Sequence, residues 1–396
     1  MRKVFIVLHA PHRGGPHIII ERIAKQLHDF GWDQYCVVPL GDDGSIKHFQ
    51  EVGVNVSNIP LRRIRRTLNP LSQLEFILTL PIDIFRIWKL IRRIDPDVVQ
   101  IVGLLHFQAS IAALLAGKPI VWQLHGSLPP AFLRRLIMIW ISLVADVLMA
   151  SGTETVNSHP GAKKFSNRLF TFMAPVDSDI FSPNVKNRQF YRDLLGIPKT
   201  AVLVGTVGNR VWVKRHDLFV EVARRIKEQF ENTYFRIVGA FVSANSQNYF
   251  LSVVRNARVK GLLDNGFLDL VDPGNNVPGY MRAMDIFLIT SMKEGTSLVT
   301  QEAMATGIPV VGFAAGSLTD SIINGETGFL VPSQNISEMC RCVSELIEKP
   351  DLRRKLGRNG RKRVIKLSTT KNCAKIHQEA YMKALDVYRE KQERYP

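Results

Sequence analysis

The stretch DIFLITSMKEGTSLVTQEAMATGIPVVGF, residues 285–313, contains the pattern that decides the fold. It opens with an apolar run that has the length and composition of a buried strand, and it closes with a second such run. Between the runs lie a loop, residues 291–297, and a helical segment, residues 298–306, that ends at Gly307. Strand, helix and strand in this order, with continuously apolar strands, predict a parallel sheet covered by helices on both faces.

The same alternation runs through most of the chain. Further strands are predicted at residues 4–8, 35–40, 97–102, 119–124, 145–151, 201–207 and 234–240, and helices at 17–31, 105–117 and 216–230. The pattern is broken once, at residues 174–187, by two prolines and several turn-forming residues. The sequence therefore predicts an α/β protein with two doubly wound, Rossmann-like domains that face each other across a cleft. We place them at residues 1–178 and 179–370, and expect a C-terminal helix, residues 371–396, to pack back on the first domain.

Composition limits the class of protein. The chain has 396 residues, of which 46% are hydrophobic and 22% charged, as in globular proteins of two ordinary domains. Its net charge of +17 favours anionic partners, such as phosphorylated ligands, an anionic membrane or nucleic acid. Nucleic acid is the least favoured of these, because the basic residues lack interleaved aromatic ones and no known binding module is recognised.

The cysteines and the apolar segments favour a cytosolic protein. The four cysteines lack the spacing of zinc ligands and are expected to be reduced thiols. The longest apolar stretch, residues 136–150, is shorter than the roughly 20 residues needed to span a bilayer.

Two carboxylates in the opening stretch need an explanation. Glu294 precedes the predicted helix, at the mouth of the strand, beside the amides of Gly295, Thr296 and Ser297. Either Thr296 or Ser297 is placed to cap the helix through its side chain. Glu302 lies within the otherwise apolar helix, where a buried carboxylate requires hydrogen-bond partners. Sugar hydroxyls would supply them, although an exposed Glu294 and a Glu302 bonded to local groups remain alternatives.

Cations follow the strand predicted at residues 201–207. Arg210 and Lys214 lie in a strand–loop–helix turn, where positive charges suit a diphosphate. The alternative is a solvated basic loop on an already basic protein.

Two turns in the first half resemble ligand-facing turns. Gly14 and Gly15 follow the first strand and let a ligand approach backbone N–H groups, although a plain tight turn is the alternative. They lack the GxGxxG pattern, so a dinucleotide site is disfavoured. His125 ends a buried strand at the edge of the sheet where ligands bind, although the residues alone slightly favour an ordinary loop histidine. The nearby histidines show no spacing typical of metal ligands, and no metal is expected.

These residues together carry a resemblance to a known family. Residues 281–332 closely resemble the nucleotide-sugar site of retaining glycosyltransferases of family 4, the group 1 glycosyl transferases with the GT-B fold. That family has two glutamates with seven residues between them, as Glu294 and Glu302 have. Residues 207–217 resemble its phosphate-binding turn, and residues 174–183 its interdomain linker.

The resemblance implies roles for the candidate residues. The second domain would bind a UDP-, GDP- or ADP-sugar, and the first a glycan or lipid-linked acceptor. Glu294 and His125 would act at the transferred sugar. The expected donor-binding residues are Gly14, Gly15, Arg210, Lys214, Gly295, Thr296, Ser297, Leu298 and Glu302. Many relatives have an arginine where this chain has Asn209, and a glutamate where it has Asp320.

The implied activity is that of a retaining hexosyltransferase of the EC 2.4 class, without cofactor or metal, in polysaccharide, lipopolysaccharide or glycolipid synthesis. Residues 62–94 and 132–150 combine arginines with apolar residues, which suits a peripheral position on the inner face of a membrane. For 62–94 a core helix is an equal alternative, and for 136–150 a core helix is favoured. A catalytically silent module of the same fold, and another enzyme such as an epimerase or phosphorylase, are the rival functions.

Overall fold

The computed structural model describes residues 1–8, 10–11, 13–41, 43–62, 70–126, 130–240 and 244–394. The chain divides into two compact units. Met1–Pro175 and Thr370–Pro396 form unit 1, and Val176–Thr369 forms unit 2. The sequence places the corresponding boundaries after residues 178 and 370.

Unit 1 is built on a sheet of seven parallel strands in the order β3-β2-β1-β4-β5-β6-β7. Its strands are β1 (Arg2–Leu8), β2 (Trp32–Pro39), β3 (Asn55–Ile59), β4 (Val98–Val102), β5 (Ile120–Leu124), β6 (Val147–Ser151) and β7 (Leu169–Phe172). Its helices are α1 (Gly15–Asp29), α2 (Asp43–Glu51), α3 (Pro70–Ile94), α4 (Phe107–Leu115), α5 (Ala131–Val144), α6 (Thr153–Ser158), the 3-10 helix η1 (Ala162–Arg168) and α15 (Thr370–Arg394).

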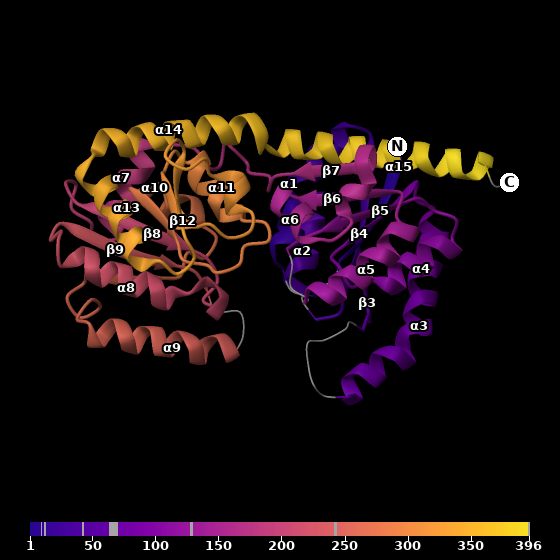
Figure 1. The fold of residues 1–396 in the computed structure, drawn as a ribbon, viewed down its shortest axis with the longest axis horizontal. Helices are drawn as coiled ribbons and strands as arrows, with labels where there is room; N and C mark the ends of the chain where they lie inside the picture. The colour runs from indigo at the N-terminus through magenta and orange to yellow at the C-terminus, as the bar shows by residue number, and fades with distance from the viewer. Residues whose placement is uncertain are drawn as a thin grey trace. The chain divides into compact units, whose positions relative to one another are not determined.

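The two faces of this sheet carry different sets of helices, because successive side chains of a strand point to opposite sides. On one face, Phe5, Ile101 and Trp122 belong to the core that α3, α4 and α5 cover. On the other face, Gln100 meets Tyr381 of α15. Figure 1 shows α15 along one side of this sheet, with α4 and α5 on the other.

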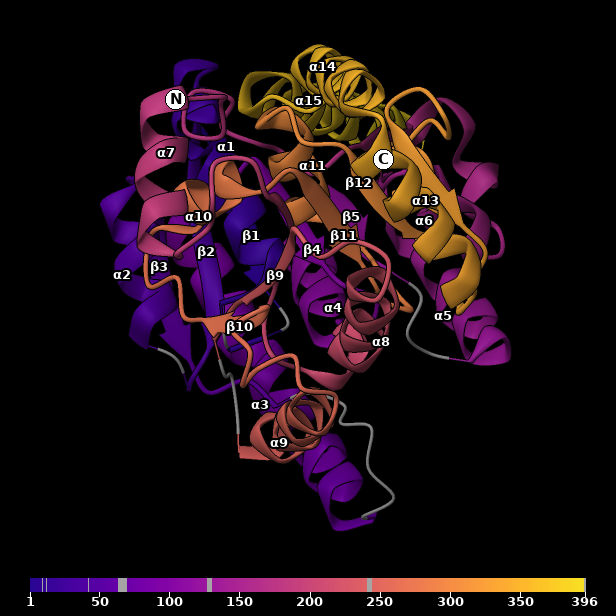
Figure 2. The ribbon, with the colours of Figure 1, turned by 90° about the vertical axis from the view of Figure 1, so that its left-hand side faces the viewer.

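Unit 2 repeats the plan with six parallel strands in the order β10-β9-β8-β11-β12-β13. Its strands are β8 (Val202–Val207), β9 (Thr233–Val238), β10 (Leu268–Val271), β11 (Ile286–Ile289), β12 (Val310–Phe313) and β13 (Gly328–Val331). Its helices are α7 (Val185–Leu194), the 3-10 helix η2 (Trp212–Lys214), α8 (His216–Lys227), α9 (Ala244–Val259), α10 (Val277–Ala283), α11 (Leu298–Ala305), α12 (Leu318–Ser321), α13 (Ile336–Glu348) and α14 (Pro350–Leu367). Figures 1 and 2 both show α9 outside α8, away from this sheet.

The predicted fold class, two doubly wound α/β domains, is confirmed. Every strand predicted from the sequence is present, but β3, β7, β10 and β13 were missed. These four are the edge strands of the two sheets. Edge strands are buried less completely than central ones, and β3 has no buried residue. They therefore lack the continuous apolar run from which the central strands are recognised.

The prediction of a plain core helix for residues 136–150 is wrong in one respect. One face of α5 is buried through Ile137, Met138, Ile141 and Val144. The opposite face exposes Phe132, Leu136, Ile139 and Leu143, which are 54% to 72% accessible. Apolar residues on both faces of a helix look alike in sequence, so only the packing separates them. Within the described part of the chain, every helix is too short or too polar to cross a membrane.

Candidate functional site

The strongest candidate site lies in unit 2, where the order of its strands reverses. Strands β8 and β11 are neighbours, and the chain continues from them toward opposite edges of the sheet. Such a switch point opens a crevice at the carboxyl ends of the strands, where α/β proteins bind ligands. Lys214 follows β8 and Glu294 follows β11, so the two charged residues predicted to contact the donor meet at this switch point.

Lys214 and Glu294 form an ion pair in the structure. Lys214 Nζ lies 2.7 Å from Glu294 Oε1, and Glu294 is only 8% exposed. The alternative of an exposed Glu294 is therefore excluded. The Thr290 hydroxyl also donates to the Lys214 carbonyl oxygen over 2.9 Å, which ties the two loops together. The position of the charged pair is thus fixed by the backbone as well as by its own attraction.

The turn between Glu294 and α11 is closed by contacts that the sequence did not predict. Ser297 occupies the N-cap position, but its side chain makes no capping hydrogen bond. Its hydroxyl lies 2.6 Å from that of Thr300, while its backbone N–H donates to Ser317 Oγ over 2.9 Å. The N–H of Leu298 donates to the Thr296 carbonyl over 3.0 Å. The prediction that Thr296 or Ser297 is the N-cap residue is therefore confirmed for Ser297, but the Ser297 hydroxyl contacts that of Thr300 and does not cap the helix.

Gly316 packs directly against the backbone of this turn. Gly316 has a φ of +55°, and a Cβ atom at this position would lie 1.9 Å from the Glu294 carbonyl oxygen. The Ser317 N–H donates to the same oxygen over 3.0 Å. Only glycine satisfies both requirements. Beyond the turn, Glu302 lies in α11 and is 5% exposed. The sequence predicted a buried carboxylate at this position in an apolar helix.

Arg210 and His216 flank the lysine loop. The Arg210 guanidinium carbon lies 4.9 Å from the centre of the Phe250 ring, and the residue is largely buried. Burial lowers the pKa of Arg210, whereas Asp272 and Asp269 raise it. His216 packs edge-on against the same ring, 5.7 Å between centroids.

His216 should make unit 2 sensitive to acid. Burial, together with Lys214 and Arg210, lowers the pKa of His216 to about 3. Between the ordinary histidine pKa and this value, the unfolded chain binds a proton that the folded unit does not, so stability falls as pH decreases. At pH 5 the loss is about 2 kcal/mol. Urea unfolding at pH 7 and pH 5 should show this difference in the wild type and a smaller one in His216→Phe. Equal pH dependence in both proteins would contradict this assignment.

Unit 1 has a pocket at its own switch point, between β1 and β4. The pocket has a volume of about 230 Å³, and its lining includes Ala10, His17, Gly103 and His125. Most of the lining is apolar, and His125 provides a polar group at the carboxyl end of β5. The structure thus places His125 where the sequence predicted, at the ligand-binding edge of the sheet.

A chain of polar side chains connects His125 to α15. Gln123 Nε2 lies 2.9 Å from His125 Nε2, and Gln123 Oε1 accepts from Gln100 Nε2. Gln100 Oε1 in turn accepts from the Tyr381 hydroxyl. Burial lowers the pKa of His125 to about 3, and His377 acts in the same direction, so the ring is neutral at pH 7. With Gln123 as donor, the ring proton is on Nδ1.

Sequence reasoning missed these two glutamines, although a signal was present. Gln100 and Gln123 each interrupt an apolar strand, and a polar residue inside a buried strand needs a partner. Their partners could not be identified, because Tyr381 lies far away in the sequence.

The predicted glycine turn is present at the start of α1. Gly14 is the N-cap residue, with an extended backbone and no side-chain cap, and Gly15 is the first helical residue. Neither glycine lines the His125 pocket, which the helix reaches through Pro16 and His17. His9 and His12 lie outside the described residues. Among the residues that are described, no group of three or more histidine, cysteine or acidic side chains could hold a metal ion.

Comparison with known proteins assigns the chain to a family. The family described as "Glycosyl transferases group 1" matches residues 187–363, and "Glycosyl transferase 4-like domain" matches residues 14–156. These two matches cover most of both units.

Individual relatives are distant. A D-inositol 3-phosphate glycosyltransferase of Kribbella flavida is 27% identical over 186 residues, 46% of this chain and 43% of that protein. An Escherichia coli UDP-Gal:alpha-D-GlcNAc-diphosphoundecaprenol alpha-1,3-galactosyltransferase is 24% identical over 276 residues, 65% of this chain and 68% of that protein. The chain spans about half the length of the first curated relatives it matches.

The fold is matched along the whole chain. The crystal structure of Anabaena HepE in complex with UDP superposes with a TM-score of 0.79 at 17% identity, covering 96% of this chain and 99% of HepE. Fold and sequence families agree, and the chain belongs to the family 4 type of the group 1 glycosyl transferases and has their GT-B fold.

Proposed function

We propose that this protein transfers a sugar from a nucleoside diphosphate sugar to an acceptor hydroxyl, with retention of the anomeric configuration. The observation that carries the proposal is the buried Lys214–Glu294 ion pair at the switch point of the second sheet. The UDP complex of a protein with the same fold supports a nucleotide-sugar donor. Cell-surface polysaccharide or glycolipid synthesis is the process we assign to it, and the diphosphoundecaprenol-linked acceptor in the name of the Escherichia coli relative supports this assignment.

Lys214 and Glu294 have complementary tasks in this proposal. The leaving nucleoside diphosphate develops negative charge as the bond to the sugar breaks, and a fixed cation stabilises that charge. Lys214 provides the cation, with Arg210 on the same loop. When Lys214 binds the diphosphate, Glu294 is left to accept hydrogen bonds from the sugar. The buried Glu302 binds the ribose hydroxyls. No step in this scheme requires a metal ion.

A neutral His125 suits a reaction through an oxocarbenium-like sugar. A second positive charge beside that sugar would oppose the developing charge at its ring. Burial keeps the imidazole uncharged at pH 7, and the contact with Gln123 over 2.9 Å leaves the ring proton on Nδ1. The His125 ring can therefore contact a hydroxyl group without repelling the transition state.

The configuration of the product tests this proposal. The purified protein is incubated with UDP-sugars of known anomeric configuration and with a lipid-linked acceptor, and the product is analysed by proton NMR. We expect the anomeric coupling constant to match that of the donor. A product of opposite configuration would contradict retention, and nucleotide binding without any product would favour a silent binding module.

The exposed apolar surface of unit 1 supports a position on a membrane. Exposed large hydrophobic residues are concentrated on α3 and α5: Leu74, Ile77, Leu78, Ile82 and Phe85 on α3, and Phe132, Leu136, Ile139 and Leu143 on α5. Both views show the N-terminal half of α3 extending beyond the other helices of this unit (Figures 1 and 2). Contiguous exposed apolar surface is typical of interaction sites, and the exposed apolar side chains on these two helices support such a role for them.

The charge around this surface selects an anionic membrane over an apolar protein partner. A groove of about 650 Å³ beside α5 is lined by Phe132, Leu136 and Ile139, with Arg135 and Lys164 on its walls. Helix α5 carries two arginines and no acidic residue. Apolar side chains flanked by cations are typical of helices that lie at a bilayer surface, where a lipid-linked acceptor would be found.

Charges placed in the apolar stripe should release the protein from membranes. Leu136→Glu combined with Ile139→Glu should reduce binding to vesicles that contain phosphatidylglycerol at least about tenfold, because two apolar contacts are lost and two negative charges face anionic lipid. Co-sedimentation measures the bound fraction. The control is Leu251→Glu, which changes an equally exposed leucine on α9 of unit 2. Binding that is equally strong in all three proteins would contradict the proposed surface.

A further inference from the structure

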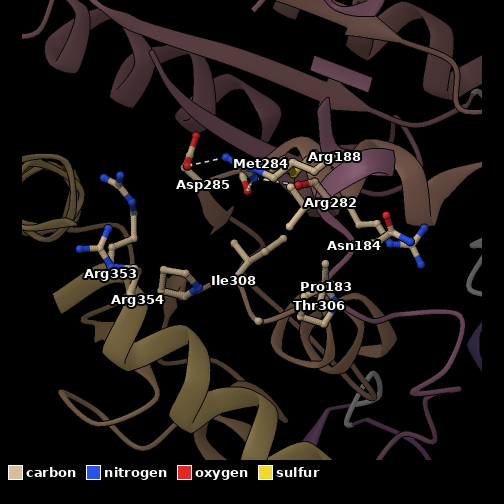
Figure 3. A pocket seen from close by; sticks show the side chains of 13 residues that line it. Pro183, Asn184, Arg188, Arg282, Met284, Asp285, Thr306, Ile308, Arg353 and Arg354 are labelled. Atoms are coloured by element: carbon tan, nitrogen blue, oxygen red, sulfur yellow. Dashed lines mark hydrogen bonds and ion pairs between the residues drawn. The ribbon is translucent and has the colours of Figure 1, made fainter. Parts of the chain in front are cut away.

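Unit 2 has a pocket at the end of its sheet opposite to the Lys214–Glu294 pair. The pocket has a volume of about 190 Å³, and residues from 183–188, 282–285, 306–309 and 353–354 line it (Figure 3). Asp285 immediately precedes β11, whereas Glu294 follows the same strand. The pocket therefore lies at the amino ends of the parallel strands, and a ligand bound there does not occupy the predicted donor site.

Positive charge exceeds negative charge around this pocket. The Asp285 carboxylate is bound on both oxygens by arginines of α7, at 2.7 Å by Arg188 and at 2.9 Å by Arg192. Arg353 adds a further cation at the wall. Among the residues that the structure describes, no carboxylate forms an ion pair with Arg353, which donates from Nη1 to the Leu346 carbonyl.

The arginines repel one another at this wall. Burial lowers the pKa of Arg353, and although Asp285 opposes the effect, the charge of Arg188 lowers it further. Arg354 acts in the same direction. Its own ion pair, with Asp351, is exposed to solvent, with side-chain accessibilities of 62% and 96%. Exposed pairs of this kind contribute little, so Arg354 can exchange Asp351 for an anion in the pocket. A bound anion would offset the repulsion within the cluster.

The walls of the pocket are preformed. Arg188 is held by the carbonyl oxygens of Arg282 and Met284, at 2.8 and 2.7 Å. Helix α14 packs so closely on the opposite loop that a Cβ atom on Gly357 would lie 2.0 Å from the Gly307 carbonyl oxygen. A rigid, positively charged wall reduces the entropic cost of binding a ligand.

The remaining lining defines the class of ligand. Ile308, Pro309 and Pro183 add apolar lining to the pocket. Figure 3 shows Ile308 between Arg354 and Pro183. From the arginine cluster and this apolar lining, we infer that the pocket is a binding site for a phosphate ester, with the phosphate on Arg353 and Arg354. The ester group would lie against Ile308 and the prolines. Guanidinium groups are suited to phosphate because their paired N–H groups match its oxygens.

Calorimetric titration with inorganic phosphate and with glucose 1-phosphate tests the site. The key variant combines Arg353→Gln with Arg354→Gln, and the control combines Arg358→Gln with Lys362→Gln, two exposed cations farther along α14. The wild type should bind both probes, the key variant should bind them at least about tenfold more weakly, and the control should change affinity less than about twofold. Arg354→Glu, at an exposed position, serves as a second variant if the double substitution does not fold.

Two further arms locate the site and identify the source of the ligand. Lys214→Ala should retain the phosphate binding that the key variant loses, because the donor site is separate. Loss of binding in Lys214→Ala with retention in the key variant would overturn the proposal, as would a wild type that binds neither phosphate nor glucose 1-phosphate and whose binding to phosphatidylglycerol vesicles is unchanged in the key variant. Binding only to the vesicles, lost in the key variant, would support the site and identify a lipid headgroup as its ligand.

Discussion

Replacement of Lys214 by Ala should reduce kcat/KM for sugar transfer about 100- to 1,000-fold. The substitution removes the cation that stabilises the leaving diphosphate and leaves Glu294, which is 8% exposed, without its partner at 2.7 Å. The fall should appear mainly in kcat, because the charge on the leaving group is greatest in the transition state. Initial rates of nucleoside diphosphate release measure the effect.

Lys293→Ala is the matched control for this experiment. Lys293 is exposed and precedes Glu294 directly, so its substitution removes a charge of the same sign from the neighbouring loop, the one that carries Glu294. We expect less than a threefold change, within the range of a solvated charge. Similar losses in both variants would mean that the general positive field of the protein, and not the ion pair at the switch point, assists the reaction.

Replacement of Gly316 by Ala should also abolish most of the activity, although Gly316 is not predicted to touch a substrate. A Cβ atom at this position would overlap the Glu294 carbonyl oxygen, so the loop that carries the carboxylate must move. A displacement of this size in a positioning loop costs about 100-fold in rate. Activity and the free energy of unfolding should both be measured, because displacement of the Glu294 loop lowers activity, whereas backbone strain at Gly316 lowers stability.

The control variant Gly325→Ala separates the effect of loop displacement from that of backbone strain. Gly325 also has a positive φ, of +76°, but no heavy atom lies within 4 Å of the position that a Cβ atom would take there. Both substitutions should therefore destabilise unit 2 by about 1 to 2 kcal/mol through backbone strain. Only Gly316→Ala should lose activity beyond that. Loss of activity in Gly325→Ala to the same degree would attribute the effect to backbone strain alone.

The central architecture could be predicted because burial leaves a strong mark on sequence. Most inner strands of both sheets are buried on two faces and are largely apolar, and β11 and β12 are so along their whole length. The edge strands β3 and β10 are half-covered and carry polar residues, so the same rule misses them. The outer limits of each sheet therefore depend on tertiary packing that no local pattern records.

The residues of the site could be placed, but their partners could not. The position of Glu294 follows from the strand before it and the helix after it. Its ion pair with Lys214 joins residues 80 positions apart, and it exists because β8 and β11 are neighbours in the sheet. In the same way, the contact of Tyr381 with Gln100 spans 281 positions. Pairings of this kind are set by strand order, which the sequence does not state directly.

The basic run at residues 353–366 shows that charge in the sequence does not by itself identify a ligand-binding site. Arg361 and Arg363 bind backbone carbonyl oxygens, among them those of Phe181 and Ser321, and so serve packing. Arg353 and Arg354 face a pocket instead. The sequence shows one continuous positive segment, and the structure divides it into structural and ligand-facing parts.

The most direct test of the account is nucleoside diphosphate release from UDP-, GDP- and ADP-sugars, measured for the wild type and for Glu294→Ala. Hydrolysis in the absence of an acceptor is sufficient if its rate can be measured. We predict that one donor class gives turnover and that Glu294→Ala removes it, because Glu294 is placed beside Lys214 at the switch point. Turnover that persists in Glu294→Ala, or absence of binding by every donor, would contradict the claim that this crevice is the donor site.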